Sequence, residues 1–345
     1  MKEKKNNRVL SAVGHILRQP EVSILVPLLV LCAVAAILNP IFLSRSNIAD
    51  TLNYISLDFI IAIGMTFTII SGGMDLSVGS VVALSGYSTG LALVSGVPAL
   101  PAVLLGLAIG ALIGLVNGAI IVSFGIPPFI TTLGMMYMVK GVVNVLSEGR
   151  PVYPFPDAFN ALAQTRFLGF PAPIFMALAL LIVASFTLRN TSFGRSVMAV
   201  GGNEAAANTS GINIKKVKIL TYVLTAMLAA FSGILLASKS GTATPGAGDG
   251  YEMNVIAAVI IGGTSLSGGN GSIVGTLIGC AIIKVLNNAM VILSVDTYWQ
   301  NIVIGAIIIL AVIVDTLRRR KMLTGGVQKA QPQKKQSRAR GEQNG

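Results

Sequence analysis

Long apolar stretches separated by short polar ones dominate the chain. About 20 consecutive, mostly apolar residues are needed for a helix to cross a bilayer, and this rule predicts ten spans. The eighth is short for a full crossing, which indicates a broken or re-entrant element. The pattern therefore predicts an all-α, polytopic transmembrane helix bundle of about ten spans. They are expected at residues 22–39, 54–71, 77–95, 100–124, 128–147, 172–189, 217–237, 251–263, 272–293 and 298–317.

The composition also points to the bilayer as solvent. Of the 345 residues, 53% are hydrophobic and only 11% are charged, whereas soluble domains are about a quarter charged. The 38 glycines favour close packing of membrane helices. Cys32 and Cys280 lie in apolar runs, and the only histidine, His15, lies near the N-terminus. This spacing forms neither a disulfide framework nor a metal site, so we expect no catalytic residue and no metal.

The net charge of +12 would suit a nucleic-acid-binding protein, but its distribution argues against that class. Of the 25 basic residues, 19 fall before Val22, between Arg189 and Lys218, or after Thr316. Positive charge stays on the cytoplasmic side of membrane proteins, so we expect both termini to be cytoplasmic and the first apolar run to be a retained span. The predicted parts are a cytoplasmic N-terminal arm (1–21), a transmembrane domain (22–317) with a cytoplasmic loop (190–216), and a basic, disordered cytoplasmic tail (318–345) that contacts anionic lipid.

A glycine-containing motif occurs twice. Residues 72–79 resemble residues 262–269, and each stretch ends one apolar segment and begins the next. Interrupted helices at corresponding places in two halves are typical of transporters built from repeats, although chance is the alternative in so glycine-rich a chain. Both breaks are expected on the cytoplasmic side, and an inverted repeat would mean that one span is miscounted. The residues expected to line or gate a pathway are Gly72, Gly73, Asp75, Ser77, Gly262, Gly263, Ser265 and Ser267.

Four charged residues lie in or beside the predicted spans. Ionisable side chains in a membrane are costly and face the interior of the bundle. Lys140 and Lys284 are expected to pair with carboxylates or to extend toward the interface. Asp58 and Asp75 could instead belong to the carboxylate relay of a proton-coupled secondary transporter. Asp75 is expected to cap the following helix through the amides of Ser77 and Val78. Direct contact of Asp75 with a substrate and a merely solvated turn are the alternatives.

The loop 191–218 is the longest polar interruption of the apolar pattern. Gly202 and Gly211 bracket an alanine-rich stretch, Asn203 is a suitable N-cap, and Glu204 would stand in the first turn. The sequence thus predicts a short helix at the cytoplasmic face that needs the bundle or a partner to hold it. The dipeptide Gly-Lys of a phosphate-binding loop does not occur in the chain. If ATP supplies energy, another polypeptide must bind it.

The same loop carries a resemblance. Gly201, Gly202, Asn203, Glu204, Ala205 and Ala206, followed by Gly211, resemble the cytoplasmic coupling loop of permeases of ATP-binding cassette (ABC) importers. Residues 71–80 and 262–269, and the block from Tyr251 to Asn288, are similar to the ribose-type (monosaccharide) members of the branched-chain amino acid/ribose permease family. The resemblance covers about residues 40–317 and implies a permease in a bacterial cytoplasmic membrane.

The resemblance further implies partners. Two permease copies, identical or not, would form the pathway, ABC ATPase subunits would bind ATP and dock on residues 201–214, and an extracytoplasmic sugar-binding protein would deliver a monosaccharide. The chain itself would hold no cofactor and would not be an enzyme. Another cargo (a sugar-like signalling molecule or a branched-chain amino acid), an ion-driven secondary transporter, and a membrane scaffold remain alternatives. Candidate sugar-binding residues, which could instead bridge helices, are Asn117, Asn144, Asn287 and Asn288.

Overall fold

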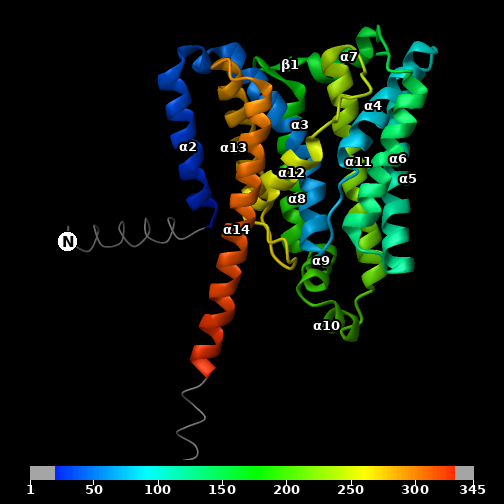
Figure 1. The fold of residues 1–345 in the computed structure, drawn as a ribbon. Helices are drawn as coiled ribbons and strands as arrows, with labels where there is room; N and C mark the ends of the chain where they lie inside the picture. The colour runs from blue at the N-terminus through cyan, green and yellow to red at the C-terminus, as the bar shows by residue number, and fades with distance from the viewer. Residues whose placement is uncertain (1–19, 331–345) are drawn as a thin grey trace, which may run out of the picture.

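The computed structural model describes residues 20–330 (Figure 1). Apolar runs form helices because a helix satisfies every backbone hydrogen bond within its own segment. The elements are α2 (Pro20–Leu38), η1 (Pro40–Leu43), α3 (Arg45–Ile70), α4 (Val78–Val94), α5 (Ala99–Phe124), α6 (Pro128–Ser147), α7 (Asp157–Gln164), β1 (Arg166–Phe167), β2 (Phe170–Pro171), α8 (Ala172–Asn190), α9 (Ser192–Gly202), α10 (Glu204–Thr209), α11 (Ile214–Ser240), α12 (Tyr251–Ile261), α13 (Ile273–Ile292) and α14 (Thr297–Ala330).

The helices confirm the predicted all-α membrane bundle. Within residues 20–330, six helices (α3, α5, α6, α8, α11 and α13) are long and apolar enough to cross a membrane. Shorter apolar helices lie in α2, α4, α12 and α14, so every predicted span coincides with a helix. The eighth span is the shortest, because α12 has only 11 residues. Helix α14 runs to Ala330. His15, nearly all of the N-terminal arm and the last 15 residues of the tail lie outside the described residues, so the predictions for both ends stay predictions.

Helix α3 is the centre of the bundle. In its most apolar stretch, 94% of the residues are buried, against 22% in α5 and in α6. Helices α8, α11, α12 and α13 surround α3. Figure 1 shows α2 at one edge of the bundle and α5 and α6 at the opposite edge. The outer helices therefore present apolar surface to lipid or to another chain, while the most apolar stretch of α3 meets neither.

Helices α5 and α11 pack closely through small residues. A side chain on this face of α5 would collide with α11: a Cβ at Gly110 would lie 2.7 Å from the carbonyl oxygen of Ala226, and one at Gly114 would lie 2.8 Å from the Cα of Val223. Such contacts between small residues replace the hydrophobic driving force that is missing inside a bilayer. The stripe recurs every fourth residue, at Gly106, Gly110, Gly114 and Gly118.

The connections contain structure that the hydrophobic pattern does not predict. Helix α7 and the β1–β2 hairpin lie at one end of the bundle, and α9 and α10 lie at the opposite end (Figure 1). In the hairpin, Phe167 is opposite Phe170. Helix α7 begins after Pro156 and buries Phe159 and Ala163. We call the end that carries α9 and α10 the coupling end, since the loop 190–216 lies there.

Candidate functional site

The two glycine-containing breaks meet the 190–216 loop at the coupling end. The amide of Gly269 donates a hydrogen bond to the carbonyl oxygen of Ile70 (2.8 Å), the last residue of α3. Gly201, near the end of α9, is wedged into this contact, because a Cβ there would lie 2.6 Å from the amide nitrogen of Gly269. A Cβ at Gly269 would lie 2.9 Å from the Cα of Gly202. Backbone therefore touches backbone between α9, the end of α3 and the segment before α13.

The first break, between α3 and α4, is a buried polar turn. Gly72 has a left-handed backbone (φ 83°) that ends α3. The Asp75 carboxylate accepts hydrogen bonds from the Ser77 amide (2.8 Å) and the Ser77 hydroxyl (2.6 Å). Asn117 of α5 donates to the same hydroxyl (3.0 Å). Of the two expected contacts of Asp75, the one with the Ser77 amide is present and the one with the Val78 amide is not found among the described residues. The contact with Ser77 fixes the turn from which α4 begins.

The first break also keeps polar atoms without partners. Among the residues that the structure describes, neither Oδ2 of Asp75 nor Oδ1 of Asn117 finds a hydrogen-bond partner. Tyr222 of α11 donates to the carbonyl oxygen of Met74 (3.3 Å) and closes the turn from the other side. A buried turn of this kind is tolerated only where it is enclosed by protein or lines a cavity.

The second break, between α12 and α13, combines a left-handed glycine with a capping side chain as the first break does, but at a different spacing. Gly263 (φ 87°) ends α12, and the amide of Ser267 donates to the hydroxyl of Ser265 (3.3 Å). The left-handed glycine precedes the capping side chain by three residues in the first break and by two in the second. The two breaks are therefore related turns at one end of the bundle, and the resemblance between their sequences is not a residue-for-residue repeat.

The loop between α8 and α11 forms two helices where one was expected. Asn203 caps α10 by accepting a hydrogen bond from the Ala206 amide (3.0 Å), and Glu204 in the first turn forms an ion pair with Lys218 of α11. Gly211 (φ 81°) ends the segment. The alanine-rich stretch is thus helical as predicted. Helix α9 was not expected, because Gly194 and Gly201 have low helix propensity; its contacts with the bundle hold it in place.

A groove opens beside this loop. It has a volume of about 620 Å³ and lies between the end of α5 and the α10–α11 segment. Val122 and Ile212 supply apolar surface, and Glu204 and Lys215 supply charge. A groove of mixed character at the end of a bundle suits a segment of another protein better than a small molecule.

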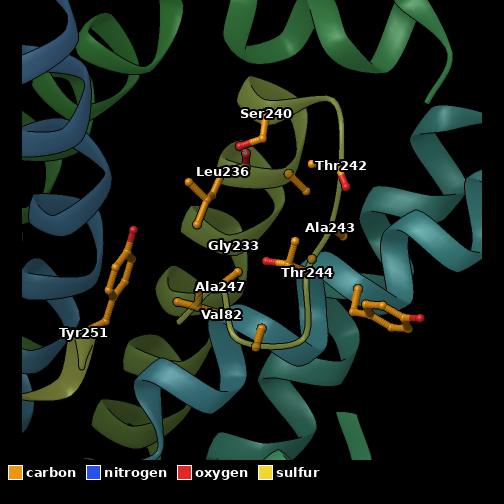
Figure 2. Close-up of a pocket in the computed structure, with 13 residues that line it drawn as sticks. Val82, Gly233, Leu236, Ser240, Thr242, Ala243, Thr244, Ala247 and Tyr251 are labelled. Carbon is orange, nitrogen blue, oxygen red and sulfur yellow. Dashed lines mark hydrogen bonds between the residues drawn. The ribbon is translucent and has the colours of Figure 1, made fainter. Parts of the chain in front are cut away.

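Toward the opposite end lies a small pocket that the sequence did not indicate. Its volume is about 230 Å³, and Figure 2 shows it between α11, the 241–247 loop and Tyr251 of α12. Hydroxyl groups of Ser240, Thr242 and Thr244 are among its polar groups. Aromatic and hydroxyl side chains of this kind suit a small polar ligand. Within the pattern of the sequence they look like ordinary core and loop residues.

Both lysines inside the spans pair with carboxylates, as predicted. Nζ of Lys284 lies 3.0 Å from Oδ2 of Asp58, and Nζ of Lys140 lies 2.7 Å from Oδ1 of Asp249. Lys284 also lies 5.3 Å from the ring centre of Tyr251, within reach of a cation–π contact. The sequence pattern did not identify Asp249 as the partner of Lys140.

The four candidate asparagines do not form one site. Asn117 is buried against Ser77, and Asn288 exchanges two hydrogen bonds with Asn47 of α3 (3.0 and 2.7 Å). Asn287 is half-buried, and Asn144 is exposed on α6. Asn288 therefore bridges helices, whereas Asn144 has free access to whatever covers α6. Among the described residues, no group of three or more His, Cys, Asp or Glu side chains could hold a metal.

Residues 47–312 match the family described as the permease component of branched-chain amino acid transport systems. The chain belongs to this permease family. The permease is 43% identical to the ribose import permease protein RbsC of Escherichia coli (strain K12) over 299 residues, which are 86% of this chain and 93% of the relative. It is 42% identical to the protein of that name from Bacillus subtilis (strain 168) over 290 residues, 84% of this chain and 90% of the relative.

A relative that is named for a different sugar is also similar. The permease is 36% identical to the D-allose transport system permease protein AlsC of Escherichia coli (strain K12) over 292 residues, 84% of this chain and 90% of the relative. No solved structure matches the permease. The family match runs from residue 47 in α3 to residue 312 in α14 and leaves out α2, so the permease is a multi-pass membrane protein of this transport family.

Proposed function

We propose that this permease is the membrane-spanning subunit of an ABC importer and carries a monosaccharide, ribose first, across a bacterial cytoplasmic membrane. The observation that carries the proposal is the 43% identity to a ribose import permease over 93% of that relative. A separate ATPase subunit binds ATP, and an extracytoplasmic sugar-binding protein delivers the sugar. A second permease copy completes the pathway.

The α9–α10 segment is the part on which the ATPase docks. Glu204 and Lys218 hold α10 to α11, and Gly201 locks α9 against the end of α3 and against Gly269. A displacement of this loop is therefore transmitted to α3 and to the segment before α13 through direct backbone contacts. Gating requires an element with two arrangements that a distant ligand can bias. The two breaks are the elements that we assign to this role.

The test is uptake of labelled ribose into proteoliposomes that contain the permease, its ATPase and its binding protein. We expect ATP-dependent uptake with all three components and none when any one is left out. Unlabelled D-allose, L-arabinose and leucine serve as competitors, and competition by leucine but not by ribose would change the cargo and keep the architecture. Uptake by the permease alone under an ion gradient would overturn the proposal in favour of a secondary transporter.

A further inference from the structure

The exposed ion pair on α6 lies deep in the membrane. Lys140 is the thirteenth of the 20 residues of α6, so its Cα stands about 18 Å from the start of the helix and about 10 Å from its end. The hydrocarbon core of a bilayer is about 30 Å thick, which places Lys140 well inside it. Nevertheless the side chains of Lys140 and Asp249 are 45% and 60% exposed.

Lipid cannot be what covers this ion pair. Charged side chains at mid-membrane face protein or a water-filled cavity, because hydrocarbon leaves them unsolvated. Helix α6 packs against α4 and α5, and this packing leaves the side chains of Lys140 and Asp249 largely exposed. Water or a second chain must therefore cover this part of α6.

The ion pair belongs to a polar stripe on α6. Tyr137, Lys140 and Asn144 are all exposed, and their spacing of three and four residues places them on one side of the helix. The neighbouring exposed positions Met138 and Val145 are apolar. One helix thus presents an apolar side suited to lipid and, next to it, a polar side that is not.

The acidic partners of the stripe are held in place by α4. Asp249 precedes α12, which begins at Tyr251 after the left-handed Gly250 (φ 80°). The Glu252 carboxylate and the carbonyl oxygen of Gly248 lie directly against the backbone of Gly79 in the first turn of α4. Asp249, just before α12, therefore brings a carboxylate to the stripe, and Glu252, in the first turn of α12, lies beside the same segment against α4.

We propose that a group of polar side chains lines the water-filled translocation pathway and forms a site that binds the hydroxyl groups of the sugar halfway through the membrane. These residues are Tyr137, Lys140, Asn144, Asp249 and Glu252. This inference rests on the proposed function. A sugar hydroxyl donates to a carboxylate and accepts from an ammonium group, so it can replace water at the Lys140–Asp249 pair without leaving a charge unpaired. The pathway has a second wall, which the same stripe of the partner copy supplies.

Two adjacent positions on α6 provide the test. Asn144 lies on the polar stripe, and Val145 is the next residue, at the same depth and exposed. Each is changed to cysteine in a chain in which Cys32 and Cys280 are alanine, and the complete transporter is treated with a charged, water-soluble methanethiosulfonate reagent. We expect Asn144→Cys to react at least about ten-fold faster than Val145→Cys, since thiolates form and react in water. Equal rates, or faster reaction at Val145→Cys, would overturn the pathway assignment.

Protection by the sugar tests the binding part. Binding protein loaded with ribose, together with ATP, should slow the modification of Asn144→Cys, and an unchanged rate would overturn the hydroxyl-binding role. Ribose uptake by the wild-type complex is measured in parallel. If uptake is normal but the two cysteines react alike, the inference fails and the proposed function stands. If the two cysteines react at different rates but no monosaccharide is taken up, the proposed function fails together with the sugar-binding role of the stripe. Only the exposure of the stripe to water is then supported.

Discussion

Two ion pairs lie at similar depth in the bundle and differ in what surrounds them. Lys284 and Asp58 join α13 to α3 at 3.0 Å, and their side chains are 13% and 3% exposed. Lys140 and Asp249 join α6 to the start of α12 at 2.7 Å, and theirs are 45% and 60% exposed. The buried pair is enclosed by helices and also contacts Tyr251. The exposed pair needs water or a partner chain, so the first serves the fold and the second serves transport.

The largest expected effect follows from breaking the buried pair. Lys284→Met leaves the Asp58 carboxylate uncompensated, which costs about 3–5 kcal/mol of the free energy of unfolding. Thermal unfolding of the purified protein in detergent would measure the loss. The double variant Lys284→Met with Asp58→Leu should recover most of it, because no charge is then left buried. A single variant as stable as wild type would show that this pair does not hold the helices.

A smaller effect separates two neighbouring glycines of α9. Gly201→Ala forces a methyl group against the backbone of Ile70 and Gly269 and should cost about 1–3 kcal/mol, with weaker coupling of ATP hydrolysis to uptake. At Gly202 a Cβ would meet no described atom within 4 Å, so Gly202→Ala is the matched control for stability and should have close to the wild-type free energy of unfolding. If both variants behave alike, the contact of α9 with the two breaks does not transmit movement.

The exposed pair should respond in the opposite way to the buried one. Lys140→Met is expected to change the free energy of unfolding by less than about 1 kcal/mol, because exposed ion pairs contribute little. The rate of sugar uptake should nevertheless fall strongly. Met138→Leu, at an exposed apolar position of the same helix, is the control and should leave uptake unchanged. If Lys140→Met destabilises the protein as much as Lys284→Met does, the distinction between the two pairs is wrong.

The smallest effect concerns Asn288, which pairs with Asn47. Interhelical hydrogen bonds in membranes are worth about 0.6 kcal/mol on average, so Asn288→Leu should be only slightly less stable than wild type and should transport normally. Asn47→Leu should show the same small loss, and the double variant should lose no more than either single one. Lost uptake with unchanged stability would instead assign Asn288 to the substrate, as its sequence position first suggested.

The sequence predicts the bundle well because span length is a physical requirement. Ten apolar runs are recognisable one by one, and the shortness of α12 follows from Gly250 and Gly262 on either side of its apolar residues. The capping of α10 by Asn203 is a local rule and is equally visible. These features depend only on neighbours in the chain.

Features that join distant segments were not predictable in this way. Lys140 and Asp249 are 109 residues apart, and nothing in the sequence around either residue identifies the other as its partner. Helix α9 contains glycines that disfavour helices locally, and its contact with Ile70 decides its structure. Tyr251 looks like an ordinary aromatic residue at the start of a span, and only the fold places it between the small pocket and the buried ion pair.

The measurement that tests the central claim most directly is the number of sugar molecules imported per ATP hydrolysed by the reconstituted complex. It would be compared among wild type, Glu204→Lys, and Glu204→Lys combined with Lys218→Glu, which restores the ion pair with reversed charges. ATP-driven import through the α9–α10 loop predicts that the single variant hydrolyses ATP with little or no uptake and that the double variant regains much of the wild-type ratio. An unchanged ratio in Glu204→Lys, or uptake that does not depend on ATP, would contradict the account.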